Sequence, residues 1–230
     1  MAVNVVQEAD RWVRVKHALV SVSDKRSLDV LVSGLMSMND DVRIYSTGGT
    51  YARIAELLGP PERERNLVRV ADYTGQPETQ GGLVKTLDFK IYLGILTETY
   101  NEAHQQDLAR TEAVAIDMVV VNLYPFRETV AKADVTVEQA RANIDIGGPC
   151  MVRASAKNYP RVASLTNPDD YQHLMRKMRM NGGRVDLQTR FELAQKAFRH
   201  TADYDMAIAA YLAEQNGKQA EACYKIRDGQ

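Results

Sequence analysis

The most apolar stretch of the chain runs from Val114 to Leu123 and contains the unbroken segment Met118-Val119-Val120-Val121. A strand that is apolar on both faces is typical of the centre of a parallel sheet, because helices cover both of its sides. Other apolar segments alternate with segments of helical spacing, at residues 15–22, 42–45, 67–70, 91–96 and 161–166. This alternation predicts an α/β fold with a doubly wound parallel sheet.

The helical segments are recognised by apolar residues that recur every three or four positions. Two such sets occur early in the chain: Leu28, Leu31, Val32 and Leu35, then Tyr51, Ile54, Ala55 and Leu58. Gly59-Pro60-Pro61 is expected to end the second helix. Thr136 to Gln139 resembles a capping box that opens a helix through Ile144, and Pro149 suits the first position of another helix.

The chain is predicted to form one domain with short appendages. Residues 1–14 are expected to be a polar arm, and residues 15–213 a single domain. Within it, residues 15–146 form the α/β core, and residues 147–213 form a mainly helical extension whose apolar residues follow one helix face. Residues 214–230 are expected to be a polar, fraying tail.

Charge and composition narrow the class of function. The chain has 29 Lys and Arg against 30 Asp and Glu, which does not favour a nucleic-acid-binding surface. Its two cysteines, Cys150 and Cys223, and its four histidines show no metal-ligand spacing, so no metal site is expected. No apolar run approaches the ~20 residues that cross a membrane, and the N-terminus lacks a signal-peptide pattern. We therefore expect a cytoplasmic protein with neither nucleic-acid nor membrane partners.

Two strand-to-helix turns have the composition of an anion-binding site. The first is Ser21-Val22-Ser23-Asp24-Lys25, and the second is Ser46-Thr47-Gly48-Gly49-Thr50. Free backbone N–H groups and the positive end of a helix dipole attract anions at such turns. Because ligands of open α/β sheets bind beyond the carboxyl ends of the strands, the pair predicts a pocket for a phosphorylated small molecule. The alternative is helix capping by Ser23 or Asp24 and a tight Gly48-Gly49 turn without a ligand.

Four further side chains are candidates for chemistry beside this pocket. Lys85, after Gly81-Gly82, would stabilise negative charge on a carbonyl oxygen. Asp145 lies between two isoleucines, where burial would raise its pKa and favour a general base. Tyr124 follows the central strand, and Lys157 follows Pro149 in a predicted helix. The alternatives are solvated lysines, a capping aspartate and a tyrosine that packs under Pro125.

Seven collinear segments give the chain a resemblance to a known family. They are Leu19 to Lys25, Ser46 to Thr50, Ala71 to Gly75, Val84 to Leu87, Val121 to Phe126, Asn143 to Pro149 and Ala156 to Asn158. In this order, between residues 17 and 212, they resemble the inosine monophosphate (IMP) cyclohydrolase domain of the bifunctional purine-biosynthesis enzyme. The resemblance implies a methylglyoxal synthase-like fold with a phosphate site at the strand ends. It also implies that no cofactor is needed and that the protein is a homodimer.

The implied reaction is the last step of purine biosynthesis, in which a formylated aminoimidazole carboxamide ribonucleotide closes to IMP and loses water. The resemblance implies catalytic roles for Lys85, Tyr124, Asp145 and Lys157. Our hypothesis for their division is that Asp145 takes the amide proton, Lys85 and Tyr124 stabilise the oxyanion and Lys157 protonates the departing oxygen. The implied substrate-binding residues are Ser23, Asp24, Lys25, Ser46, Thr47, Gly48, Gly49, Thr86, Asn122, Leu123, Ile146 and Gly147. A separate formyltransferase is expected to supply the substrate.

The chain departs from the family pattern around the candidate lysine. Leu83 stands where the family has an arginine, and leucine lacks the forked donors of a guanidinium. Asp88-Phe89 and Tyr92-Leu93 replace a His-Pro and a His-Gly pair. Two other functions therefore stay open: a nucleotide-binding regulatory module without turnover, and a methylglyoxal synthase-like lyase that acts on a triose phosphate.

Overall fold

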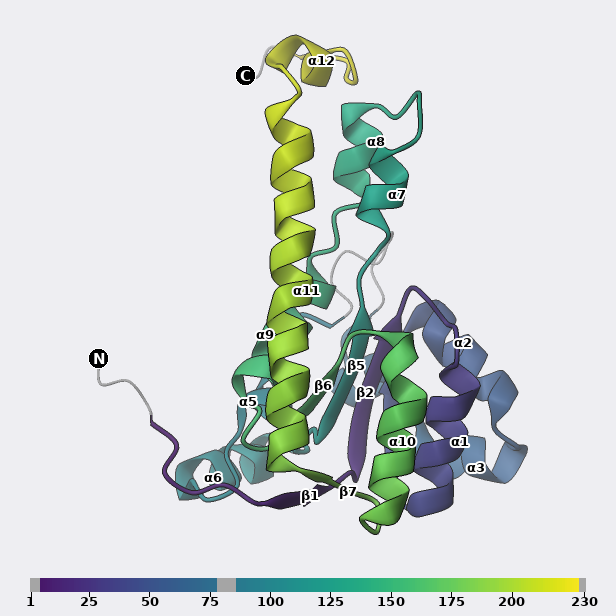
Figure 1. Ribbon diagram of the computed structural model, residues 1–230, viewed down its shortest axis with the longest axis vertical. Coiled ribbons are helices and arrows are strands. Elements are labelled where there is room, and N and C mark those ends of the chain that lie inside the picture. Colours follow the sequence, from purple (N-terminus) through teal and green to yellow (C-terminus); the bar gives the residue numbers. More distant parts are fainter. Residues whose placement is uncertain (1–4, 78–85, 228–230) are drawn as a thin grey trace.

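The structure, a computed structural model, describes residues 5–77 and 86–227. Its centre is a five-stranded parallel sheet with the strand order β4-β3-β2-β5-β6 (Figure 1). The strands are β2 (His17–Val22), β3 (Arg43–Ser46), β4 (Leu67–Arg69), β5 (Met118–Asn122) and β6 (Ala163–Leu165). Strands β2 and β5 are paired along their length, from Ala18 opposite Met118 to Val22 opposite Asn122. The predicted central strand is therefore confirmed.

Alternate residues of the central strands face two separate cores. Ala18 and Val20 of β2 belong to one apolar cluster, whereas Leu19 belongs to the other. Strand β5 divides in the same way, and each of its residues is buried. Burial on both faces explains why this segment is apolar without alternation.

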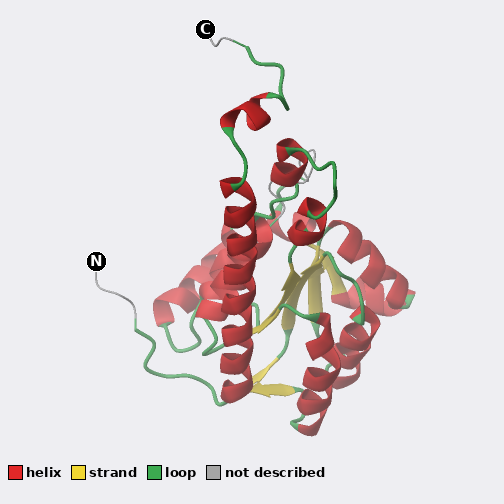
Figure 2. Ribbon diagram, turned by 45° about the horizontal axis from the view of Figure 1, so that its top comes forward, coloured by secondary structure: helices red, strands yellow, loops and turns green. Residues whose placement is uncertain are grey.

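Helices cover both faces of the sheet (Figures 1 and 2). On one side lie α1 (Leu28–Met38), α2 (Gly48–Leu57) and α10 (Tyr171–Met180), and on the other lie α5 (Phe89–Leu96), α9 (Gly147–Lys157) and α11 (Leu187–Ala213). The doubly wound α/β arrangement is thus confirmed. The shorter elements α4 (Val70–Thr74), α6 (Glu102–Thr111) and the 3-10 turn Pro168–Asp170 lie in the connections.

Residues 91–96 were expected to be one of the strand-like apolar segments. This prediction was wrong, because they form part of helix α5. Ile91, Gly94 and Ile95 are the buried residues of α5, which is the spacing of one helix face. The carboxylate of Asp88 accepts a hydrogen bond from the amide of Lys90 at 2.8 Å and caps this helix. The apolar content of the segment therefore reflects a buried helix.

The predicted end of the second helix is confirmed, and two other predicted helix boundaries shift in the structure. Helix α2 ends at Leu57, and the two prolines begin α3 (Pro60–Asn66), because the first turn of a helix needs no amide donor. The capping box at Thr136 is confirmed, but its helix, α8 (Val137–Ala142), ends before Ile144. Helix α9 begins at Gly147, so Pro149 takes its third position.

The predicted N-terminal arm is tied to the C-terminal part of the chain. Strand β1 (Trp12–Arg14) pairs antiparallel with β7 (Arg184–Asp186). The fully buried guanidinium of Arg190 donates hydrogen bonds to four backbone carbonyls, those of Asp10, Tyr159, Pro160 and Val185. Residues 10–14 are therefore part of the domain, contrary to the predicted boundary.

The 27-residue helix α11 runs from β7 past the sheet to α7 (Phe126–Val130) and α8 (Figure 1). Beyond it, α12 (Gly217–Glu221) begins with a capping box at Asn216. The hydroxyl of Tyr224 donates to the carboxylate of Glu138 at the start of α8. Part of the predicted tail is thus helical and contacts the domain. None of the described helices has the length and apolarity that crossing a membrane requires.

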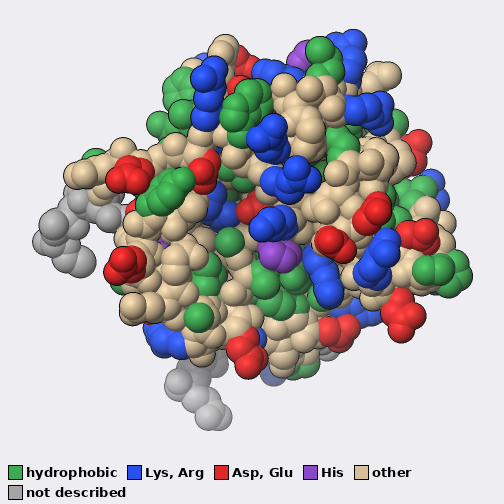
Figure 3. Space-filling model, turned by 90° about the horizontal axis from the view of Figure 1, so that it is seen from below, with side chains coloured by type: hydrophobic (Ala, Val, Ile, Leu, Met, Phe, Trp, Pro, Cys, Tyr) green, Lys and Arg blue, Asp and Glu red, His purple; other side chains and the backbone are tan. Residues whose placement is uncertain are grey.

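A buried ion pair lies at the amino edge of the sheet, directly before β5. Nη1 of Arg161 lies 3.0 Å from Oδ1 of Asp117, and the guanidinium also donates to three backbone carbonyls, those of Gly94, Thr97 and Ile116. Figure 3 views the molecule from this edge, where Lys and Arg side chains are interspersed with Asp and Glu. This mixed surface agrees with the near-zero formal charge of −1.

Candidate active site

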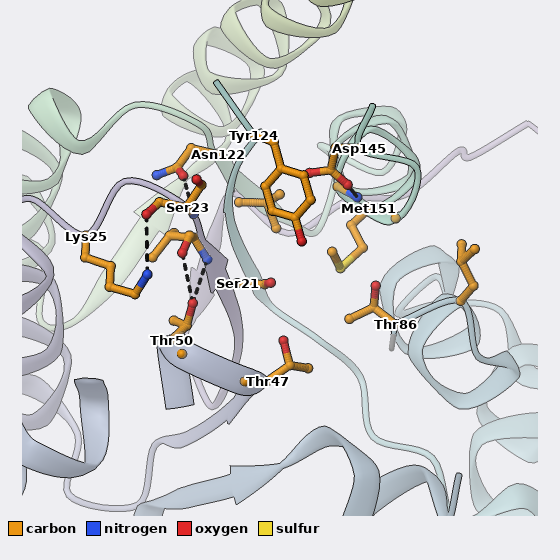
Figure 4. A pocket seen from close by; sticks show the side chains of 17 residues that line it. Ser21, Ser23, Lys25, Thr47, Thr50, Thr86, Asn122, Tyr124, Asp145 and Met151 are labelled. Carbon is orange, nitrogen blue, oxygen red and sulfur yellow. Dashed lines mark hydrogen bonds between the residues drawn. The ribbon is translucent and has the colours of Figure 1, made fainter. Parts of the chain in front are cut away.

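A cavity of about 250 Å³ lies at the opposite, carboxyl edge of the sheet (Figure 4). Its lining comes from segments far apart in the sequence, within residues 21–25, 47–50, 86–87, 121–124 and 145–151. The two predicted anion-binding turns and the predicted carboxylate therefore share one cavity. This is the position in which open α/β sheets bind their ligands.

Asn122, the last residue of β5, fixes the shape of the first turn. Its Oδ1 accepts hydrogen bonds from the amides of Ser23 and Asp24 at 2.7 and 2.8 Å, and its Nδ2 donates to the Asp24 carbonyl at 2.9 Å. Helix α1 begins only at Leu28, so neither Ser23 nor Asp24 caps it. Asn122 was expected to bind substrate, and its side-chain amide is engaged in holding the turn.

The second turn is joined to the first through Thr50. The Thr50 hydroxyl accepts a hydrogen bond from the amide of Val22 and donates to the Val22 carbonyl, each at 3.0 Å. Gly48 has a φ of 48°, in the left-handed region that favours glycine, and it begins α2. A Cβ placed on Gly49 would lie 3.9 Å from Nζ of Lys25. An ammonium and a helix N-terminus thus converge on one point, as anion binding requires.

Asp145 lies on the far side of the cavity, just before α9. Its Oδ1 accepts a hydrogen bond from the amide of Gly148 at 2.8 Å. Burial raises the pKa of the Asp145 carboxyl, and the hydrogen bond from Gly148 opposes part of this rise. The two interpretations of Asp145, a capping residue and a candidate general base, are compatible. Its carboxylate accepts a hydrogen bond from the start of α9, and its pKa is raised by burial.

The Tyr124 ring lies between Asp145 and the first turn, with its hydroxyl directed into the cavity (Figure 4). Thr86 lies across from it, and a Cβ placed on Gly147 would meet the Thr86 hydroxyl at 2.9 Å. The cavity is therefore bordered by hydroxyl groups on two sides, with the carboxylate between them. Such a lining suits a polar ring system.

A second cavity, of about 580 Å³, adjoins the first and shares Ser23, Asn122 and Tyr124 with it. It extends between the first turn, the loop after β5 and α11. Together the two cavities offer the volume that small-molecule ligands need, which starts at ~300 Å³.

The structure brings together ten of the predicted site residues at the first cavity: Ser23, Lys25, Thr47, Gly48, Gly49, Thr86, Asn122, Tyr124, Asp145 and Gly147. Ser46 does not join them, because it is fully buried and its hydroxyl donates to the Val20 carbonyl at 2.7 Å. Asp24, whose carboxylate is paired with Arg26 at 2.7 Å, and Leu123 line the second cavity, whereas Ile146 is 60% exposed outside both. Lys85 lies outside the described residues, as does Leu83.

Lys157 is not brought to this cavity by the fold of one chain. It is the last residue of α9, whereas Asp145 precedes the first, so ~15 Å of helix separates them. Its exposed side chain lines a different cavity, beside the N-terminal arm and Tyr159. Within one chain Lys157 therefore does not reach the Asp145 cavity, and its catalytic role stays a prediction.

Several lining or supporting residues were missed. Thr50 and Met151 line the cavity, and Gly148 leaves space for the carboxylate beside it. Tyr204 reaches the site from α11, because the amide of Asp145 donates to its hydroxyl at 2.8 Å. The paired Gly147-Gly148 was a visible signal of close approach. The contact between Tyr204 and Asp145 has no local signal in the sequence, because the two residues are 59 positions apart. No group of three or more His, Cys, Asp and Glu in the described ranges is arranged to hold a metal ion.

Comparison with known proteins identifies the family of this chain. The family model described as an MGS-like domain matches residues 29–150, which is more than half of the chain. The chain belongs to the MGS-like family. A second model, described as the AICARFT/IMPCHase bienzyme, matches residues 155–229 of this MGS-like chain. The two matches together include the long helix α11 and the cavity lining other than residues 21–25 and Met151.

The relatives with curated names are bifunctional purine biosynthesis proteins. PurH of Synechococcus sp. (strain CC9605) is 50% identical over 198 residues, and PurH of Acidithiobacillus ferrooxidans is 46% identical over 209 residues. Each comparison covers 86% of this MGS-like chain and 37% of the relative, so the chain corresponds to only part of those proteins. Among solved structures, one titled "Crystal structure of ForH" has a TM-score of 0.70 and 33% identity, with 85% of this chain and 97% of that chain covered.

Proposed function

We propose that this chain is an IMP cyclohydrolase, which closes the purine ring of 5-formamidoimidazole-4-carboxamide ribonucleotide with loss of water. The observation that carries the proposal is that two anion-binding turns and a half-buried carboxylate share one cavity, in a chain whose relatives are named PurH. A ribonucleotide needs both parts, a site for its phosphate and a base near its reacting ring.

The phosphate would bind at the two turns. Lys25 supplies a positive charge over the start of α2, and Thr47, Gly48 and Gly49 line the cavity there. Ser23, on the same turn as Lys25, also lines the cavity. With the phosphate held at this end, the heterocycle would extend toward Tyr124 and Asp145, which lie on the far side of the same cavity.

The reaction joins the carboxamide nitrogen to the formyl carbon. Both groups are held on one imidazole ring, so proximity supplies much of the rate, and a base must still remove the amide proton. Asp145 is the proposed base, because burial raises its pKa and so strengthens it as a proton acceptor.

Bond formation converts the formyl oxygen into a hydroxyl on a tetrahedral carbon. That hydroxyl leaves as water when it gains a proton and the adjacent ring nitrogen loses one, so no oxidant or group carrier is consumed. The Tyr124 hydroxyl is the proposed donor to this oxygen, and Lys85 is the proposed positive charge beside it on the family resemblance. Lys157 would enter this scheme only from another subunit.

The test is turnover of the formylated ribonucleotide by the purified protein, followed by the absorbance of the hypoxanthine ring. We expect turnover in the wild type and its loss in Lys85→Ala and Asp145→Asn. Lys218→Ala, on the exposed helix α12, is the matched control and should leave the rate unchanged. Substrate binding without turnover would instead support a regulatory module, and release of phosphate from a triose phosphate would support a lyase.

We further propose that the protein is a homodimer in the cytoplasm and that a formyltransferase activity supplies its substrate. The outer face of α11 exposes Phe191, Phe198, Met206 and Leu212, each at least 40% accessible, and these residues lie on one side of the helix. Both cysteines are free, which suits a reducing compartment. Sedimentation equilibrium would report the subunit number directly.

A further inference from the structure

Tyr204, on the long helix α11, connects the two loops that carry Tyr124 and Asp145. We propose that Tyr204 is a positioning residue for the ring-closing reaction and that it holds the Asp145 loop in its reactive arrangement. This inference rests on the proposed function of the cavity. Tyr204 lines the second cavity but not the first, and its hydroxyl is engaged by the backbone of Asp145 and Asn143, so its proposed role is exerted through the Asp145 loop.

The Tyr204 hydroxyl is both a hydrogen-bond acceptor and a hydrogen-bond donor. It accepts the backbone hydrogen of Asp145 at 2.8 Å and donates to the carbonyl of Asn143 at 3.3 Å. The side chain is only 8% exposed, so these partners are not easily replaced by bulk water. One phenol thus fixes the backbone on both sides of Ile144, immediately before the carboxylate.

The ring of Tyr204 contacts the other loop. It packs edge-to-face on Phe126, with 6.2 Å between the ring centres, and Phe126 is fully buried two residues after Tyr124. A single side chain therefore links the segment that carries the candidate base to the segment that carries the candidate hydroxyl donor. The relative position of these two groups depends on a helix that begins at residue 187.

The expected chemical consequence concerns the basicity of Asp145. Burial raises the pKa of this carboxyl, and a loop released from Tyr204 would let the carboxylate reach water. The described titratable groups around it are the phenols of Tyr124 and Tyr204, with Asp205 beside Tyr204 on α11 and the Lys25 ammonium across the cavity. The amides of Gly148 and Tyr124, which lower the pKa of this carboxyl, would remain while its burial decreased, so the carboxyl should become a weaker base.

The test compares Tyr204→Phe with Tyr211→Phe. Phenylalanine at 204 keeps the ring contact with Phe126 and removes only the hydroxyl. Tyr211 also packs edge-to-face on Phe126, at 6.0 Å, two helical turns further along α11, and is the matched control. We expect kcat to fall by roughly 10- to 100-fold in Tyr204→Phe, with KM changed less than about threefold. Tyr211→Phe should retain wild-type values of both.

A second measurement does not depend on turnover. The pKa of the Asp145 carboxyl is obtained by 13C NMR titration of aspartate-labelled protein, with Asp145→Asn used to assign the resonance. It should move toward the ordinary aspartate value in Tyr204→Phe and stay in place in Tyr211→Phe. An unchanged titration in Tyr204→Phe would overturn the proposal. If the wild type showed no ring closure, the proposed function would fail, and the titration would still decide the role of Tyr204.

Discussion

The amide of Gly148 donates a hydrogen bond to Oδ1 of Asp145 at 2.8 Å, and the α-carbon of Gly148 faces the same carboxylate. A Cβ at this position would overlap Oδ2 of Asp145 and would lie 2.7 Å from the side chain of Leu123. Glycine is therefore required by close approach, although its φ is not in the left-handed region.

Gly148→Ala should displace the carboxylate from its position in the cavity. We expect kcat to fall by roughly 100-fold, because small displacements of a reacting group carry large penalties. Steady-state kinetics with the formylated ribonucleotide measures this effect. Gly217→Ala is the matched control, since a Cβ there meets no atom within 4 Å, and it should leave kcat unchanged. Equal rates in the two variants would contradict the steric argument.

Asp145→Asn should lower turnover by roughly 100-fold or more, the usual contribution of a general base. The wild-type rate should fall as the pH drops through the raised pKa of Asp145, so the acid limb should lie above the ordinary aspartate value of about 3.9. The variant should lack this limb. A pH profile of kcat/KM measures both outcomes, and an acid limb that survives in Asp145→Asn would assign it to another group.

The same substitution should stabilise the fold. Because burial raises the folded-state pKa of Asp145, its contribution to stability is present below the ordinary pKa and is lost as the pH rises through the raised value. Asparagine can keep the bond from the Gly148 amide without a buried charge. We expect the Tm of Asp145→Asn to exceed that of the wild type more at pH 8 than at pH 4, as measured by differential scanning fluorimetry. A difference that shrinks with rising pH would contradict the assigned direction.

Asn122 should matter to the first turn more than to the base of the substrate. Asn122→Ala leaves the amides of Ser23 and Asp24 without their acceptor, at about 1–3 kcal/mol for each unsatisfied buried group. Asn122→Asp keeps the acceptor but adds a negative charge beside the anion site. Asn122→Ala should therefore lower the Tm more than Asn122→Asp does, and Asn122→Asp should lower the affinity for inorganic phosphate more than Asn122→Ala does. The opposite ranking would show that the amide contacts the ligand directly.

Lys157→Ala should change kcat by less than about threefold if the site is formed by one chain, because the α9 helix carries Lys157 ~15 Å from Asp145. Kinetics at several protein concentrations measures this. A large loss that appears only in the dimeric protein would indicate that a second subunit contributes Lys157.

Much of the sheet could be predicted because its signals are local. Met118 to Val121 is buried on both faces, and the turns after β2 and β3 carry their polar residues at the expected edge. The β1–β7 pair could not be predicted, since two strands of three residues lie more than 160 positions apart and have no local pattern.

Site residues were predicted well where a loop follows a strand and poorly where a helix intervenes. Tyr124 and Asp145 lie in loops at the carboxyl edge, whereas Lys157 is carried away by the rise of α9. Ser46 illustrates a different limit, because a hydroxyl in a turn can bond a neighbouring strand as readily as a ligand. The role of Tyr204 depends on its packing against a distant loop, which composition does not reveal.

The guanidinium of Arg190 has consequences for how the protein can be shortened or fused. Its hydrogen bond to the Asp10 carbonyl ties the N-terminal segment to a buried cation whose other donors bond Tyr159, Pro160 and Val185. Trimming the chain past Asp10 would remove one carbonyl acceptor from the buried Arg190 guanidinium, whereas a tag added before Val5 would leave this hydrogen bond intact. The workable starting point for an engineered version is therefore set by an arginine near the other terminus.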